Sequence, residues 1–154
     1  DGKFDGGKLS ESELALRNYY IKVMNISAFH PAMLGQYSPI DIQAAHGTDA
    51  NSGQVLARSF AEKLVAFTRH TDDQSLLVVS HFNHQQSVNL QLVLPAGLIQ
   101  NLMQHLKDNN NHSEAQQVQR LDLLSGQNYS LRVKGNLALF ELTLAPMQSV
   151  VIQL

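Results

Sequence analysis

The sequence predicts an all-β fold: an antiparallel Greek-key β-sandwich preceded by one N-terminal α-helix and carrying one short inserted helix. Seven or eight short apolar runs, separated by close turns, occupy residues 36–154, and this pattern is typical of a two-layered antiparallel body. Before them, one capped segment carries apolar residues at helical spacing. With 154 residues, 44% of them apolar, the chain is long enough for one domain with a substantial core.

The N-terminal helix is predicted from Glu11 to Ala28. Ser10 and Glu13 form a capping box, in which the serine hydroxyl accepts from the N3 amide and the glutamate accepts from the cap amide. His30 precedes a proline, and a residue in that position is driven out of the helical conformation. The apolar stripe along this helix consists of Leu16, Tyr20, Val23 and Met24.

The strands are predicted from period-two alternation and from continuous apolar runs. Ser75–Ser80 is apolar on both faces and should be a central strand, whereas polar His46–Gln54 is predicted to be a loop. The predicted strands are Tyr37–Ala45, Leu64–Arg69, Ser75–Ser80, Val88–Leu94, Val118–Leu124, Tyr129–Val133, Leu137–Leu144 and Val150–Leu154. A short helix is expected at residues 98–107, and Gly135–Asn136 is typical of a two-residue hairpin turn.

Composition limits the function classes. Only 16% of residues are charged and the formal net charge is −2, so no basic patch is available for nucleic acid. We expect no membrane partner, because no apolar run approaches the ~20 residues that a crossing needs. There is no cysteine, and we expect no cofactor and no metal. The compartment stays open, with a periplasmic or secreted location favoured over a cytoplasmic one.

Several segments, taken in order, resemble one known family. The helix motif Leu16–Lys22, followed by His30–Met33 and then Gly35–Tyr37, resembles the closing barrel helix of α-amylase-type glycoside hydrolases (glycoside hydrolase family 13). In that family an all-β C-terminal domain begins after this helix. Four further segments resemble strands and turns of that domain: Leu64–Arg69, Leu76–Asn83, Leu121–Gly126 and Leu142–Pro146. The segment 97–119 is longer than the family leads us to expect.

The resemblance implies two parts, with residues 1–35 as the end of a (β/α)₈ barrel and residues 36–154 as the C-terminal β-sandwich domain. It implies that the parent enzyme hydrolyses α-1,4-glucosidic bonds of starch-like glucans and that its catalytic carboxylates lie upstream. The chain itself is then an inactive fragment with no catalytic residue, whose domain stabilises the barrel. Two alternatives remain: a free-standing carbohydrate-binding sandwich module, or the tail of an α-glucosidase or glucan transferase of the same family.

The acidic and histidine residues of the chain give weak site candidates. Asp72 and Asp73 are adjacent on a predicted turn, where their side chains point apart, so we do not expect them to act as a catalytic pair. Glu141 should be exposed on its strand. His81 and His84 have a spacing that suits a metal only on a helix, so we expect them to be a surface pair.

Sugar-binding surfaces usually present aromatic rings, and this chain contains no tryptophan. Tyr37 and Tyr129 are the candidate carbohydrate-binding residues, whereas the helical Tyr19 and Tyr20 are better explained by packing. The expected partners are the catalytic barrel, an α-glucan, and a second copy of the isolated chain bound through the exposed helix face.

Overall fold

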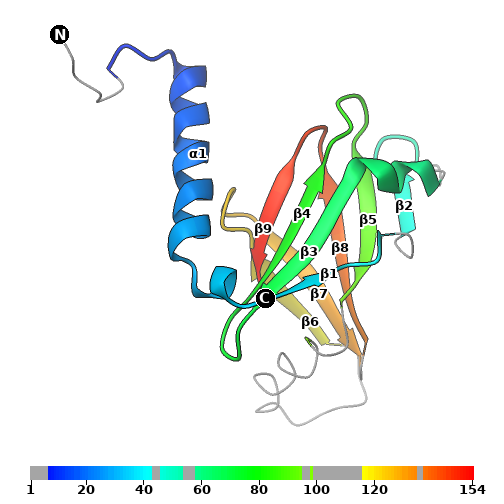
Figure 1. The fold of residues 1–154 in the computed structure, drawn as a ribbon. Coiled ribbons are helices and arrows are strands. Elements are labelled where there is room, and N and C mark those ends of the chain that lie inside the picture. Colours follow the sequence, from blue (N-terminus) through cyan, green and yellow to red (C-terminus); the bar gives the residue numbers. More distant parts are fainter. Residues whose placement is uncertain (1–6, 43–45, 54–57, 95–97, 99–115, 135–136) are drawn as a thin grey trace.

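The computed structural model describes residues 7–42, 46–53, 58–94, 98, 116–134 and 137–154. Within these ranges, one α-helix precedes nine strands (Figure 1). The helical elements are α1 (Glu11–Phe29), η1 (Pro31–Leu34) and η3 (Arg58–Lys63). The strands are β1 (Gln36–Pro39), β2 (His46–Asp49), β3 (Leu64–His70), β4 (Ser75–His81), β5 (Val88–Val93), β6 (Gln116–Leu121), β7 (Asn128–Lys134), β8 (Leu137–Leu144) and β9 (Ser149–Gln153).

Helix α1 begins and ends where local chemistry predicts. The Ser10 amide donates to Glu13 Oε2 at 2.8 Å, and the Glu13 amide donates to Ser10 Oγ at 3.4 Å, so the capping box is complete. The helix ends one residue beyond the predicted Ala28, because His30, before Pro31, is extended with ψ of 123°. The predicted N-terminal helix is therefore confirmed.

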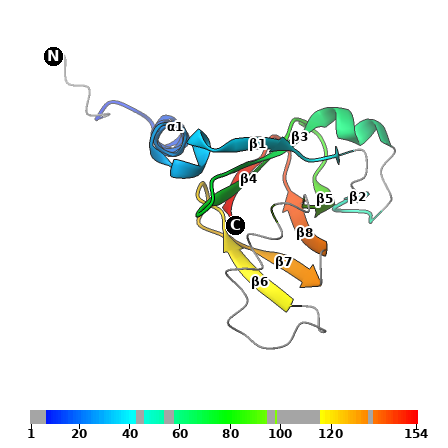
Figure 2. The same cartoon turned by 60° about the horizontal axis from the view of Figure 1, so that its bottom comes forward.

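The strands form two antiparallel sheets that pack face to face. One sheet has the order β1-β3-β4-β9 and the other β2-β5-β8-β7-β6. In the second sheet, three consecutive strands β6, β7 and β8 are followed in space by β5, which lies beside β8; this is a Greek-key arrangement. Figure 2 shows the two layers, with β3 and β4 in one and β6, β7 and β8 in the other. The predicted fold class is confirmed.

The core lies between the sheets and is built from the inward side of each strand. Strand β4 is flanked by β3 and β9, which confirms the prediction of a central strand. Its Leu77 and Val79 are fully buried. The opposite layer contributes alternate residues of β5, β7 and β8: Val88, Leu90, Leu92, Leu131, Val133, Ala138, Phe140, Leu142 and Leu144.

Three predicted boundaries are wrong. His46–Asp49, predicted as loop, is the edge strand β2, because pairing with β5 requires only backbone hydrogen bonds and no apolar alternation. The strand predicted at Tyr37–Ala45 is reduced to β1, which ends at Pro39, a residue that cannot donate to a ladder. Strand β6 begins at Gln116 and stops before Asp122, whose carboxylate organises the next turn.

Two predictions lie outside the described residues. Of the predicted helix at 98–107, only Leu98 is described, and it is helical and buried. The predicted turn residues 135–136 are also outside, although the strands on either side pair antiparallel with Lys134 opposite Leu137. The division between residues 1–35 and 36–154 stays a prediction.

Candidate functional site

The exposed side of α1 is the first candidate surface. No residue of α1 is buried. Leu16, Tyr20 and Met24, spaced by four residues on one side of the helix, are 55%, 59% and 64% exposed. Tyr19 packs edge to face on Tyr20, with ring centroids 6.0 Å apart. Exposed apolar side chains gathered on one face mark an interaction surface.

Only the C-terminal turns of α1 lie beside the sandwich. Figure 2 views α1 nearly along its axis, outside the sheet that contains β3 and β4. An apolar cavity of about 140 Å³ separates the helix from this sheet; its lining is Val23, Ile26, Ser27, Met33, Phe67, Val78 and Val151. The four residues of the predicted apolar stripe therefore do not share one environment. Val23 faces the sandwich, whereas Leu16, Tyr20 and Met24 are exposed to solvent.

Three polar or close contacts hold this helix segment to the sandwich. Lys22 Nζ donates to the Leu124 carbonyl at 2.6 Å. The Arg69 guanidinium, at the end of β3, donates to the Met33 carbonyl of η1. Gly35 lies so close to β3 that a Cβ there would be 2.0 Å from the His70 carbonyl oxygen. The junction between α1 and β1 is thus fixed by specific contacts.

Asp122 organises the loop that Lys22 reaches. Its side chain is fully buried, and Oδ1 accepts from the amides of Leu124 at 3.2 Å and Val151 at 2.8 Å. Oδ2 accepts from the Ser125 amide at 3.0 Å and hydroxyl at 2.5 Å. Because Val151 belongs to β9, this carboxylate ties the end of β6 to the edge of the opposite sheet. It serves structure, and sequence reasoning did not identify it.

The two candidate tyrosines have different surroundings. Tyr37 on β1 is 53% exposed, and its ring lies 5.3 Å from the ring of Phe67. Tyr129 on β7 is half-buried against the core, and burial, followed by the charge of Asp122, raises the pKa of its hydroxyl. Tyr37 is therefore the more accessible of the two, and a carbohydrate role for either stays a prediction.

The remaining candidates are separated in space. Asp72 and Asp73 are exposed on the turn between β3 and β4. His84 is exposed, but His81 is buried, with Nδ1 3.1 Å from the Ala145 carbonyl oxygen, so the expected surface pair is wrong for His81. The part of the chain that the structure describes holds no group of three or more potential metal ligands. Nor does any helix in it combine the length and apolar character needed to cross a membrane.

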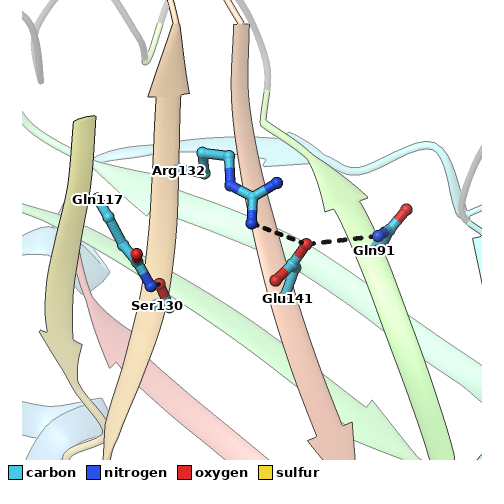
Figure 3. A network of polar contacts seen from close by, with 5 residues as sticks. All are labelled: Gln91, Gln117, Ser130, Arg132 and Glu141. Carbon is cyan, nitrogen blue, oxygen red and sulfur yellow. Dashed lines mark hydrogen bonds and ion pairs between the residues drawn. The ribbon is translucent and has the colours of Figure 1, made fainter. Parts of the chain in front are cut away.

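A polar groove on the outward face of the second sheet is a surface that sequence reasoning missed. It has a volume of about 510 Å³, and its lining is Thr48, Asn89, Leu90, Gln91, Glu141, Leu142 and Thr143. Figure 3 shows Glu141 between Arg132 and Gln91: Arg132 lies 3.6 Å from Oε1, and Gln91 Nε2 donates to the same oxygen at 3.4 Å. Glu141 is exposed, as predicted.

Comparison with protein families identifies the sandwich. The family model described as the α-amylase C-terminal all-β domain matches residues 59–154, which is more than half of the chain. The chain belongs to the α-amylase C-terminal all-β domain family. It is the non-catalytic domain of an amylase-family enzyme, as the segment order Leu64–Pro146 led us to expect.

Solved structures support the same fold for this α-amylase C-terminal domain. A crystal structure of a variant of AmyP in complex with maltotriose matches with a TM-score of 0.54 at 21% sequence identity. The match covers 95% of this chain but only 22% of AmyP, so the chain corresponds to about a fifth of that protein's length. At this identity the likeness establishes the fold alone. No curated protein sequence matches the chain significantly.

Proposed function

We propose that residues 1–35 complete a catalytic (β/α)₈ barrel and that residues 36–154 form a C-terminal domain that stabilises it. The parent enzyme hydrolyses α-1,4-glucosidic bonds of starch-like glucans. The match to the α-amylase C-terminal all-β domain supports this proposal. So does the likeness to AmyP, a much longer protein whose crystal structure contains maltotriose.

The observation that carries the proposal is the exposed apolar side of α1. Fully burying one large aliphatic or aromatic side chain contributes roughly 1.5–3 kcal/mol. Most of this stabilisation is not realised for Leu16, Tyr20 and Met24, because each of these side chains is more than half exposed. Docking against a barrel would remove all three from water and would fix the sandwich to the barrel at the same time.

A matched pair of variants tests this role in the isolated chain and in the longer enzyme. The double substitution Leu16→Ser and Met24→Ser should leave the unfolding free energy of the isolated chain within about 0.5 kcal/mol, because both side chains already contact water. In the enzyme that contains the barrel, it should lower the melting temperature by several degrees. Asn18→Ser, an exposed polar position of the same helix, is the control.

The possible outcomes distinguish docking to the barrel from a free-standing module and from a dimer of the isolated chain. Equal melting temperatures for the variant and parent enzymes would contradict barrel docking and would favour a free-standing module. The proposed bond specificity is tested by assaying the enzyme on amylose. We expect hydrolysis by the parent enzyme and its loss when the barrel carboxylates alone are replaced. A second copy of the isolated chain could cover the same helix face, and the double substitution should abolish any such dimer in sedimentation experiments.

A further inference from the structure

The polar groove on the second sheet differs from the outward face of the first sheet. The first sheet presents Phe67, Val78 and Val151 to α1, so it is a packing surface. On the second sheet, the outward positions in and beside the groove are mostly polar. Amides and hydroxyls come from Thr48, Asn89, Gln91, Ser130 and Thr143, with Gln117 and Gln119 further out, and Glu141 and Arg132 form a charged pair among them. Amide and hydroxyl groups donate and accept hydrogen bonds, as sugar hydroxyls do.

Register places these groups in rows across the strands. Thr48 lies opposite Asn89, and Asn89 lies opposite Thr143. One pleat further along, Gln91 lies opposite Glu141. Side chains two residues apart on a strand share a face and are separated by about 7 Å. The two rows therefore form a continuous strip of hydrogen-bonding groups along the groove.

The groups in the strip are already held in place. Thr143 Oγ1 donates to Asn89 Oδ1 at 2.8 Å. Both contacts of the Glu141 carboxylate fall on Oε1, and in Figure 3 the second carboxylate oxygen takes part in neither of the two dashed contacts. An oriented carboxylate oxygen next to ordered amides is a strong acceptor for hydroxyl groups, because a charged acceptor roughly doubles hydrogen-bond strength.

The charges at the groove favour an uncharged ligand. Glu141 and Arg132 balance each other at 3.6 Å, so the groove offers no excess charge to a polyanion or a cation. An apolar flank continues the strip at its next row, where Val93, 46% exposed, lies opposite Leu139. This combination suits an oligosaccharide, whose rings carry both hydroxyl groups and apolar C–H faces.

We propose that the groove lined by Asn89, Gln91, Glu141 and Thr143 binds an uncharged oligosaccharide through its hydroxyl groups. The choice of an α-1,4-glucan as that oligosaccharide rests on the proposed function. Because the groove lining contains no aromatic ring, most of the affinity comes from hydrogen bonds, and the apolar flank of Val93 and Leu139 adds a smaller contribution. We therefore expect a dissociation constant on the order of 1 mM.

Titration of the ¹⁵N-labelled chain with maltohexaose tests the proposal. We expect saturable shifts of amide signals on β5 and β8. Glu141→Ala, and the pair Asn89→Ala with Thr143→Ala, should each weaken binding about tenfold, which corresponds to the loss of one charge-assisted hydrogen bond or two neutral ones. Gln117→Ala, on the same face but outside the groove lining, should bind like the parent chain. Unchanged amide spectra in the absence of sugar show that each variant is folded.

The alternative results overturn the proposal. Absence of saturable shifts up to about 20 mM sugar, far above the expected dissociation constant, rules out the site. Binding that survives the groove substitutions but is lost in Tyr37→Ala would place the sugar on the other sheet. The groove is remote from the exposed side of α1, so either result leaves the barrel-docking test unaffected.

Discussion

Replacing Asp122 by alanine should be among the most destabilising single changes in this domain. The side chain is fully buried and accepts from three backbone amides and one hydroxyl. Removing it leaves the amide of buried Leu124 and that of half-buried Val151 without their acceptor. Each such orphaned group costs about 1–3 kcal/mol, and the exposed Ser125 can turn to water. Relief of carboxylate burial offsets part of this loss, so we expect a net loss of about 3 kcal/mol.

Urea unfolding followed by circular dichroism measures this loss directly. Asp122→Asn keeps one oxygen for the amides of Leu124 and Val151 but presents an NH₂ group to Ser125, so it should cost about half as much. Asp73→Ala, on an exposed turn, is the control and should lie within about 0.5 kcal/mol of the parent chain. A loss below about 1 kcal/mol for Asp122→Ala would refute the assigned role of the carboxylate.

Three further predictions concern the helix junction. Gly35→Ala should cost more than about 2 kcal/mol in urea unfolding, because its Cβ would lie 2.0 Å from the His70 carbonyl oxygen; Leu34→Ala, at a position that is 91% exposed, should be neutral. Burial lowers the pKa of His30, whose Nδ1 accepts from the Ala32 amide. The neutral imidazole therefore contributes its full stabilisation at a pH above 6.5, the ordinary pKa of histidine, and this stabilisation is lost as the pH falls below 6.5. The variant His30→Asn keeps an acceptor for the Ala32 amide but has no imidazole to protonate. Between about pH 7.5 and 5, its free energy of unfolding should therefore fall less than that of the parent chain. Ser27→Leu should fill the 140 Å³ cavity under α1 and raise the unfolding free energy by about 1 kcal/mol, and a decrease would show that the cavity cannot accept the side chain.

The parts of the fold that follow local rules could be predicted from the sequence. The capping box and the His30–Pro31 pair set both ends of α1 to within one residue. Alternation and apolar runs located β3, β4, β5, β7, β8 and β9. Strand β2 could not be predicted this way, because its four residues HGTD carry no apolar alternation and pair with β5 through the backbone.

The candidate surfaces were predictable only where neighbouring residues define them. The exposed side of α1 is a run of i, i+4 positions, so its apolar character is visible in the sequence. The groove joins Asn89 to Thr143 and Gln91 to Glu141, residues more than 45 positions apart whose proximity depends on register. The role of Asp122 likewise depends on Val151, which only the pairing of the two sheets brings near.

The two outward faces of the sandwich limit how the domain can be placed in a larger enzyme. Only the C-terminal turns of helix α1 lie beside the sheet of β3, β4 and β9, and the side that carries Leu16, Tyr20 and Met24 is exposed. A barrel that buries Leu16, Tyr20 and Met24 must therefore approach from the α1 side. The groove of the second sheet, on the opposite side of the core, then stays in solvent. An accessory site in this groove could bind a glucan without competing with the contact between the domain and the barrel. The two roles can therefore be tested separately in one molecule.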